Sequence, residues 1–237
     1  MGDTNTDLIL ITGASKGIGR AAAERFRRSG IPVINISRSP CTVDGVENHA
    51  LDLTLPDAEQ TLRSVVGERV KGGQISIIHN AAMMTKDTAD ATETASFLEV
   101  LTLNVVAPHI INQALLPLMQ PGSSVIYIGS TLSEKAVANT YSYVTSKHAI
   151  VGMMRATCQD LAGREIHTCC VCPGFTDTQM LREHVGNDEE VLKAIAGLST
   201  FGRLITPDEI AGTIAYAVDN PVVNGSVINA NLGQVES

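Results

Sequence analysis

The sequence predicts an α/β fold, a single-domain doubly wound parallel sheet of the Rossmann type with helices on both faces. Short apolar runs recur along the 237 residues, segments of helical length separate them, and a glycine-rich turn follows the first run. Alternating strands and helices are typical of strand–helix–strand units, which build parallel sheets. Because residues 1–237 contain no repeat, linker or shift in composition, we expect one domain.

The expected strands are runs of Val, Ile and Leu that end in turn residues, as buried strands do. They cover residues 8–12, 33–37, 75–79, 125–129, 166–171 and 227–229. The expected helices repeat apolar residues every three or four positions. They include residues 21–28, 95–115 and 146–161. One further strand, within residues 50–54, is expected to end at Asp52.

The charge balance argues against a surface for nucleic acid. Against 25 Asp and Glu residues there are 17 Lys and Arg residues, which gives a net charge of -8, and no basic block is present. No apolar run approaches the ~20 residues that span a bilayer. The five cysteines have no regular spacing, which favours a reducing compartment. The N-terminal residues are acidic and lack the features of a secretory signal. We therefore expect a cytoplasmic protein with no nucleic-acid or membrane partner.

Cys169 and Cys172 have the spacing of a metal or redox pair. Side chains three apart on a strand point to opposite faces of the sheet, so the expected strand keeps these two thiols apart. We therefore expect no metal site and interpret both cysteines as small buried residues.

The turn at residues 12–19 lies between the first strand and the first helix. Gly13 allows a tight turn, whereas Gly17 and Gly19 let the backbone approach a pyrophosphate and let the helix pack on the strand. The N-terminus of the helix offers free N–H groups to anionic oxygens. This context favours a dinucleotide site over an ordinary glycine-rich turn. The residues assigned to it are Gly13, Ser15, Lys16, Gly17, Ile18 and Gly19.

The residues after the second strand indicate which dinucleotide binds. An NADH site usually has a carboxylate there, on the ribose 2′-hydroxyl, but this chain has Ser37 and Arg38. Arg38 can hold a 2′-phosphate by two parallel hydrogen bonds, and Lys16 can reach the same group. We therefore expect NADP(H), the alternative being a solvated arginine. Asp52 and Leu53 are expected at the adenine, although an aspartate that closes a turn fits Asp52 nearly as well.

Tyr143 and Lys147 are four residues apart, so on a helix they share one face. A nearby ammonium favours the tyrosinate, so Lys147 is expected to lower the pKa of Tyr143 from its usual value of about 10. Ser130 follows a strand and can hydrogen-bond a carbonyl oxygen, which must gain a proton when hydride reaches its carbon. Alone, such residues are more often surface and turn residues. Together with the glycine loop they become candidates for catalysis.

These motifs resemble the short-chain dehydrogenase/reductase family over the whole chain. The supporting segments, in the family's order, are residues 12–19, 79–82, 101–104, 130, 143–147, 173–178 and 202–210. The resemblance implies that Tyr143 is the general acid and base, that Lys147 holds the nicotinamide ribose and lowers the pKa of Tyr143, and that Ser130 orients the carbonyl. It also implies a water relay at Asn104. The remaining implied cofactor contacts are Asn80, Pro173, Gly174, Thr176 and Thr178.

Two positions near the expected cofactor path depart from the family pattern. Ala82 stands where the family usually has glycine, which adds a methyl group beside that path. His79 replaces a frequent asparagine, and we interpret it as a buried histidine at a strand end. Neither change removes a catalytic group.

We therefore expect an NADPH-dependent oxidoreductase that transfers hydride between the nicotinamide and a ketone, aldehyde or secondary alcohol. The substrate should have an apolar body, because the expected pocket residues are apolar. These residues are Met83, Met84, Leu132, Val137, Phe175, Met180 and Leu181. Residues 179–202 are expected to form a substrate lid, as in the family. Two alternatives are a 3-oxoacyl carrier-protein reductase and a dinucleotide sensor without turnover.

The expected helix at 146–161 has apolar residues on more than one side, among them Ala149, Met153 and Ala156. A helix that buries only one face against the core needs fewer apolar residues, so a second face of this helix is expected to be buried. The family pairs this helix and the preceding one across a two-fold axis, so we expect a homodimer or homotetramer.

Overall fold

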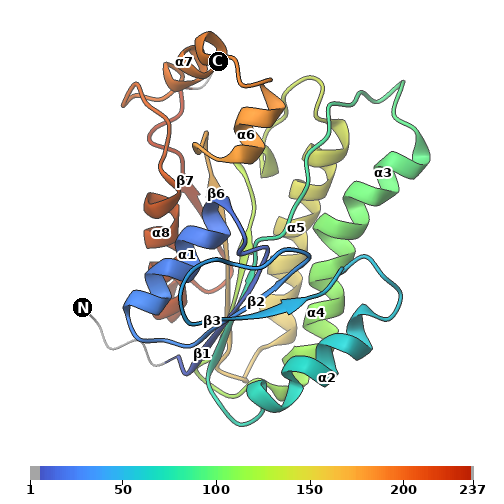
Figure 1. Cartoon of the computed structure of the whole chain (residues 1–237), viewed down its shortest axis with the longest axis vertical. Helices are drawn as coiled ribbons and strands as arrows, with labels where there is room; N and C mark the ends of the chain where they lie inside the picture. Colours follow the sequence, from blue (N-terminus) through green and yellow to red (C-terminus); the bar gives the residue numbers. More distant parts are fainter. Residues whose placement is uncertain (1–5, 236–237) are drawn as a thin grey trace.

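A computed structural model describes residues 6–235 as one parallel sheet with helices on both faces (Figure 1). The strand order β3-β2-β1-β4-β5-β6-β7 is that of a doubly wound fold, and the expected fold class is confirmed. The strands are β1 (Leu8–Thr12), β2 (Val33–Ser37), β3 (Val46–Ala50), β4 (Ile75–His79), β5 (Ser124–Ile128), β6 (His167–Pro173) and β7 (Ser226–Ala230). Six of them overlap the expected strands.

The third strand is displaced from the position that the sequence indicated. β3 ends at Ala50, so Asp52 lies beyond the strand and not at its end. β3 pairs on one side only, with β2, and its five residues are half-buried or exposed. An edge strand of this kind lacks the continuous apolar run of a central parallel strand, which is why the pattern hid it.

Helices cover the sheet as two layers (Figure 1). The α-helices are α1 (Gly17–Arg28), α2 (Ala58–Val70), α3 (Thr94–Leu101), α4 (Ala107–Leu115), α5 (Tyr141–Asp160), α6 (Gln179–His184), α7 (Glu189–Ala196) and α8 (Pro207–Asp219). Shorter helices are the π-helix η1 (Thr102–Val106) and the 3-10 helices η2 (Leu116–Leu118), η3 (Thr131–Ser133) and η4 (Pro221–Val223). Buried residues of α1 and α8 share one core cluster, and those of α2, α4 and α5 share the other.

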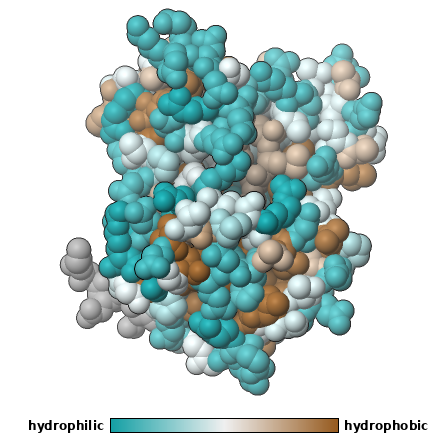
Figure 2. All heavy atoms as spheres, in the orientation of Figure 1, coloured by the Kyte–Doolittle hydropathy of each residue, from teal (hydrophilic) through white to brown (hydrophobic). Residues whose placement is uncertain are grey.

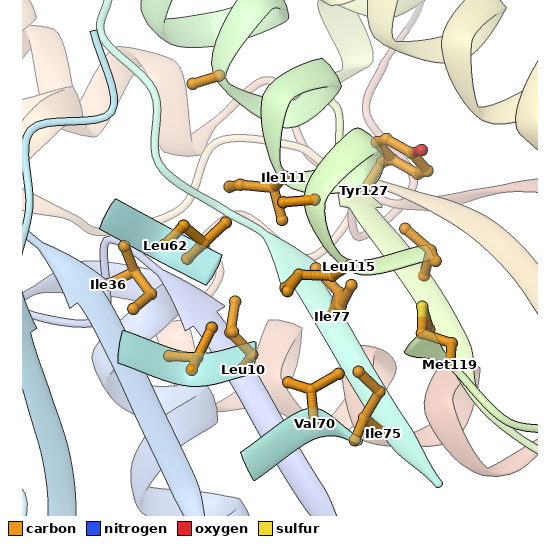
Figure 3. Packing of buried hydrophobic residues seen from close by; sticks show 14 of the residues in the cluster. Leu10, Ile36, Leu62, Val70, Ile75, Ile77, Ile111, Leu115, Met119 and Tyr127 are labelled. Carbon is orange, nitrogen blue, oxygen red and sulfur yellow. The ribbon is translucent and has the colours of Figure 1, made fainter. Parts of the chain in front are cut away.

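Figure 3 shows how the second of these layers packs. Leu10 and Ile77 project from β1 and β4 toward Leu62 of α2 and toward Ile111 and Leu115 of α4. All five side chains are fully buried. Burying each side chain of this size contributes about 1.5–3 kcal/mol relative to leaving it in water. This layer holds α4 and α5 in fixed positions against the central strands.

Cysteines of β6 divide between the two faces of the sheet. Cys169 belongs to the cluster under α1 and α8, and Cys172 belongs to the opposite cluster. The expectation that these two thiols are kept apart is therefore confirmed. Cys170 and Cys172 share a face, with their Sγ atoms 3.8 Å apart, and all five cysteines are free thiols.

Helices α3, η1, α4 and η2 run on as one helical stretch, Thr94–Leu118. By length and composition this stretch could cross a membrane, but a core helix of a soluble protein passes the same test. Here α4 packs on α2 and contributes to the core. Only 28% of the most apolar part of the stretch is buried. The remainder leaves an apolar surface on this side of the molecule.

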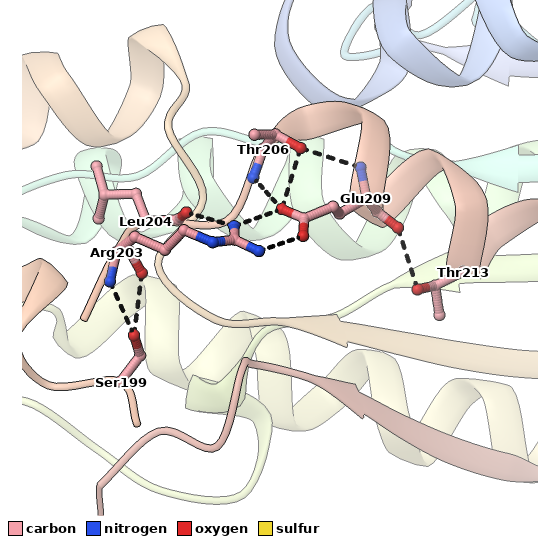
Figure 4. Close-up of polar contacts among 6 residues, drawn as sticks. All are labelled: Ser199, Arg203, Leu204, Thr206, Glu209 and Thr213. Atoms are coloured by element: carbon pink, nitrogen blue, oxygen red, sulfur yellow. Dashed lines mark hydrogen bonds and ion pairs between the residues drawn. The ribbon is translucent and has the colours of Figure 1, made fainter. Parts of the chain in front are cut away.

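The segment that leads into α8 is fixed by a compact polar cluster (Figure 4). Thr206 caps α8 in a capping box with Glu209, and Arg203 donates to both carboxylate oxygens of Glu209, at 2.8 and 2.6 Å. The Arg203 guanidinium beside Glu209 lowers the pKa of that carboxyl to about 2. Ser199 also donates to the Arg203 carbonyl. These contacts anchor the C-terminal end of the 179–202 segment.

Candidate active site

A cavity of about 950 Å³ lies at the carboxyl ends of the strands, where doubly wound sheets bind their ligands. Loops after β1 to β6 line it, together with α5, α6, α7 and the C-terminal segment. Of the site residues that the sequence indicated, all except Gly19 and Asn104 contribute to its wall. The structure therefore brings the glycine loop and the Ser-Tyr-Lys group to one cavity.

The glycine loop has the backbone that its sequence requires. Gly13 and Gly17 have φ angles of 69° and 56°, in the left-handed region that favours glycine. A Cβ atom on Gly19 would lie 2.4 Å from Asn80 Nδ2 and 2.5 Å from the Gly13 carbonyl oxygen. Gly19 is therefore a packing residue that lets α1 approach β4, and for this reason it does not reach the cavity.

The N-terminus of α1 faces the cavity with its N–H groups uncapped by any side chain. Lys16 occupies the capping position without a side-chain hydrogen bond, and the first turn has no acidic residue. The Asn80 side chain donates to the carbonyl oxygens of Thr12 and Gly13, at 2.9 and 3.0 Å, which fixes the loop to β4. A rigid, uncapped helix start of this kind fits a pyrophosphate.

At one end of the cavity, cations stand where a ribose phosphate would be held. Lys16 and Arg38 are exposed, line the cavity, and form no ion pair within residues 6–235. Asp52 also lines it, but its Oδ1 accepts hydrogen bonds from the backbone N–H and the hydroxyl of Thr54. These two bonds lower the pKa of Asp52. The hydrogen bonds of Asp52 are therefore those of an aspartate that closes a turn, as the alternative interpretation expected.

Ser130 lies directly after β5 and caps the 3-10 helix η3. Its Oγ accepts from the Leu132 N–H at 3.1 Å, and Ser133 Oγ accepts from the Ser130 N–H at 3.1 Å. The Ser130 oxygen thus accepts one hydrogen bond, and its hydroxyl group can also donate one. The capping box therefore gives this hydroxyl a fixed position in the cavity wall.

Tyr143 and Lys147 both lie on α5, buried and facing the cavity. Lys147 Nζ is 5.4 Å from the centre of the Tyr143 ring and donates to the Ile128 carbonyl oxygen at 2.7 Å. Burial raises the pKa of Tyr143 to about 12, although a hydrogen bond with the Ser130 side chain opposes this shift. The expectation that the pKa of Tyr143 lies below its usual value is therefore wrong for this structure.

The pKa of Tyr143 depends on its burial. Spacing on a helix shows which side chains are neighbours, but it does not show how far water is excluded from them. Here burial, which disfavours the charged phenolate, is the largest cause of the raised pKa of Tyr143, and it outweighs the hydrogen bond with Ser130. Burial also lowers the pKa of Lys147 to about 8, which leaves most of this lysine charged at pH 7. The pair at neutral pH is thus a neutral tyrosine beside a cationic lysine.

Asn104 does not line the cavity. Its side chain accepts from the Met83 N–H at 2.8 Å and donates to the Met83 carbonyl and to Ser146 Oγ, at 2.9 and 3.0 Å. It sits in the π-helix η1, a local irregularity of the long helix. Asn104 therefore fixes the loop after β4 to α5. Met83, also expected in the pocket, does not line it.

The other end of the cavity is mainly apolar. It includes six of the seven expected pocket residues, namely Met84, Leu132, Val137, Phe175, Met180 and Leu181. Four further residues line the cavity without having been expected from the sequence, namely Ile195, Leu198, Gln234 and Val235. Backbone bonds hold these C-terminal residues, including one from the Val235 N–H to the Leu198 carbonyl at 2.7 Å. No local motif marks such a long-range contact.

His79 is a core residue of β4, as expected. Its Nε2 lies 2.9 Å from Asn112 Oδ1, and its ring centre is 4.8 Å from that of Tyr127. Burial lowers the pKa of His79 to about 4, so the ring is neutral at pH 7. It does not line the cavity, and a neutral imidazole is not a general acid at this pH.

Known proteins share both the sequence pattern and this fold. The profile of the family described as "Enoyl-(Acyl carrier protein) reductase" matches residues 13–234. Dehydrogenase/reductase SDR family member 6 of Xenopus laevis is 29% identical over 230 residues, which cover 91% of each chain. The 3-oxoacyl-[acyl-carrier-protein] reductase FabG of Vibrio cholerae is 26% identical over 237 residues, 94% of this chain and 95% of the relative.

Solved structures of other proteins share the fold of this chain over nearly its whole length. A short chain dehydrogenase family protein from Francisella tularensis is 26% identical, with a TM-score of 0.87 over 96% of this chain and 98% of its own. Aldohexose dehydrogenase of Thermoplasma acidophilum, at 24% identity, shares the fold with a TM-score of 0.88 over 98% of this chain and 94% of its own. With a family profile that covers 222 residues and a matching fold, the chain belongs to the short-chain dehydrogenase/reductase family of oxidoreductases.

Proposed function

We propose that this chain is an NADPH-dependent carbonyl reductase. It transfers hydride between NADP(H) and a ketone or aldehyde with an apolar body, or a secondary alcohol in the reverse direction. The observation that carries the proposal is the convergence of Ser130, Tyr143 and Lys147 on a cavity whose far end holds Lys16 and Arg38. A solved relative of the fold, described as a gluconate 5-dehydrogenase from Beutenbergia cavernae, has NADP bound.

The residues present fit a dinucleotide along the length of the cavity. Gly13, Gly17 and the start of α1 suit the pyrophosphate, and Lys16 and Arg38 suit the 2′-phosphate. Leu53 and Asn80, with the turn at Asp52, suit the adenosine side, and Pro173, Gly174, Thr176 and Thr178 suit the nicotinamide side of the wall. The cofactor supplies or accepts the hydride when it is bound.

The chain itself supplies the proton and the polar environment of the carbonyl. The Ser130 hydroxyl donates to the carbonyl oxygen and orients it. Tyr143, neutral because burial raises its pKa to about 12, donates its proton to the oxygen as negative charge develops there. The Lys147 ammonium stabilises the tyrosinate that remains, and the apolar wall excludes water from this exchange. Residues 179–202 form the lid over this end of the cavity.

The test is NADPH oxidation, followed by absorbance at 340 nm, with a panel of aryl and alkyl ketones and aldehydes. A carbonyl reductase consumes NADPH at a rate that depends on the carbonyl compound. A dinucleotide sensor would bind NADPH with the same fluorescence change but would oxidise it with none of the compounds, and this result would refute the proposal.

A second candidate is reduction of 3-oxoacyl groups on a carrier protein, because FabG and MabA reductases are among the relatives. Carrier proteins are acidic, and docking one favours a basic surface. The lid instead exposes Glu183, Asp188, Glu189 and Glu190, and its Arg182 is paired with Asp177 and Glu189. A free small substrate is therefore favoured. The deciding measurement compares kcat/KM for a 3-oxoacyl carrier protein with kcat/KM for the same acyl group on a small thiol. A carrier-protein reductase prefers the first substrate, and a reductase of small carbonyl compounds does not.

Arg38→Asp should weaken NADPH binding by about 1.5–3 kcal/mol, roughly 10- to 150-fold in Kd, because a charge-assisted contact to the 2′-phosphate is lost. NADH lacks that phosphate, so its Kd should change much less. Fluorescence titration of each cofactor measures both values. Arg28→Asp, an exposed change outside the cavity, is the control. Equal losses for NADPH and NADH would refute the assignment of Arg38.

The chain should assemble as a symmetric dimer or tetramer through α3, α4 and α5. Leu98 and Val106 are 53% and 42% exposed, and Ala149 and Ala156 are exposed on α5. Hydrophobic residues also break the hydrophilic surface near the position of α3 (Figure 2). Covering this face with a second copy removes apolar surface from water. Light scattering at low micromolar concentration should give twice or four times 25.1 kDa, and a monomer mass would contradict it.

We also place the protein in the cytoplasm. Its five cysteines are free thiols, four of them buried, as suits a reducing compartment.

A further inference from the structure

Two lysines line the substrate end of the cavity, whose wall is otherwise mainly apolar. Within residues 6–235, the ionisable side chains other than tyrosine in this part of the wall are Lys135, Lys147 and His184. Burial lowers the pKa of His184 and favours its neutral form, so the two lysines supply the positive charge. Asp52 is the one carboxylate in the described wall, and it lies at the adenosine end. A low-dielectric cleft lined by one sign of charge concentrates ligands of the opposite sign.

Lys135 is the cation that the proposed reaction leaves unused. It lies between η3 and α5, is half-buried, and forms no hydrogen bond or ion pair with any residue in the described range 6–235. The carboxylate next to it in sequence, Glu134, is exposed, accepts from Asn229 and does not line the cavity. An ammonium without a partner in a cavity wall can form a charge-assisted hydrogen bond with an anionic group of a ligand.

The neighbouring cavity does not explain this charge. It has a volume of about 860 Å³, and it shares Ala138, His184 and Val185 with the main cavity. Its wall contains Lys86 but also Asp87 and Glu93, so the charges there are mixed. The cofactor phosphates belong with Lys16 and Arg38 at the opposite end. Lys135 therefore belongs neither to the neighbouring cavity nor to the expected site of the cofactor phosphates.

We infer that the substrate carries an anionic group, a carboxylate, that Lys135 binds while Ser130 and Tyr143 hold the carbonyl. The substrate class is then an oxo acid with an apolar body, or the matching hydroxy acid in the reverse direction. This inference rests on the proposed function and specifies its substrate. Lys135 acts as a specificity residue, because it contacts the substrate away from the reacting atoms.

The test compares acids with their uncharged esters. Benzoylformate, benzoylacetate and 3-benzoylpropionate place a carboxylate at increasing distance from a ketone beside one apolar ring. Each is assayed with NADPH against its ethyl ester. At least one acid should exceed its ester in kcat/KM by about 10- to 100-fold, the range of a charge-assisted hydrogen bond. The preference should weaken as salt is raised.

Variants locate the effect at Lys135. Lys135→Gln should remove the preference for the acid, mainly through KM, and leave kcat/KM for the ester within about threefold. Lys135→Arg, which keeps the charge, should retain most of the preference. Lys193→Gln removes an exposed lysine of the lid helix α7 that does not line the cavity, so it should change neither substrate.

A binding measurement separates this inference from the proposed function. In the NADPH complex, calorimetry should detect benzoate but not benzamide, and Lys135→Gln should abolish the difference, whether or not any ketone is reduced. Equal binding of benzoate and benzamide, or equal turnover of all acids and esters, would overturn the inference and leave the carbonyl reductase intact. If no ketone were reduced but benzoate still bound more tightly than benzamide, the proposed carbonyl reductase activity would be overturned and the anion site would stand.

Discussion

Replacing Lys147 should cause the largest loss of activity of any single change in the cavity. The side chain is buried, and its Nζ holds the Ile128 carbonyl at 2.7 Å, directly before the turn that carries Ser130. With a pKa of about 8, it supplies the cation nearest to Tyr143 at pH 7. Lys147→Ala removes this cation and the ribose contact that the family resemblance implies. We expect turnover to fall on the order of 1,000-fold, with weaker NADPH binding.

Lys147→Met separates loss of charge from loss of volume. Methionine fills much of the space of the lysine stem, so its variant should keep the native circular dichroism spectrum while losing activity as the alanine variant does. Any activity left in either variant should have a higher pH optimum, because the remaining tyrosinate lacks its cation. Steady-state kinetics and NADPH titration measure both effects. A methionine variant with turnover within tenfold of the native enzyme would remove Lys147 from the mechanism.

The central fold could be predicted because parallel strands are buried on both faces. β1 is Leu-Ile-Leu-Ile-Thr and β4 is Ile-Ser-Ile-Ile-His, and such apolar runs stand out in a sequence. β3 could not be predicted in the same way, since Val-Glu-Asn-His-Ala is the composition of a half-exposed edge. The start of α5 was also missed, because the polar residues Ser142 and Ser146 interrupt its apolar pattern although both are buried.

The catalytic group was predictable for a different reason. Spacing of four on a helix fixes the relation of Tyr143 to Lys147, and a position directly after a strand fixes Ser130 at the carboxyl edge of the sheet. Burial is a property of the whole fold, so the direction of the pKa shift of Tyr143 could not be read from spacing. Gln234 reaches the cavity only through pairing with the segment at Ser199.

The protonation state of Tyr143 gives the reaction a direction-dependent response to pH. Burial raises its pKa to about 12, so the phenol is protonated throughout the neutral range. Carbonyl reduction uses that proton and should be nearly constant between pH 6 and pH 7.5, as long as Lys147 stays charged. Alcohol oxidation needs the deprotonated form, whose population rises about tenfold for each pH unit below the pKa. Its rate should therefore increase with pH over the same interval.

Tyr143→Phe tests this assignment because it removes only the hydroxyl group. The ring remains buried against its neighbours, so the fold and NADPH binding should survive, while turnover in both directions falls on the order of 100-fold or more. The rise of the oxidation rate with pH should disappear with the hydroxyl. Initial rates in each direction, combined with NADPH titration, measure these effects.

Tyr141→Phe is the matched control on the same helix. Tyr141 is 43% exposed, its ring stacks on Phe97, and it does not line the cavity. The same loss of a hydroxyl group there should leave both rates and both pH profiles unchanged. If Tyr143→Phe kept near-native turnover of an active ketone, the proton would have to come from another donor. His79 could not take this role, because its ring is neutral at pH 7 and lies behind the cavity wall. A bound water would then be the remaining source, and the assignment of Tyr143 as the acid would be wrong.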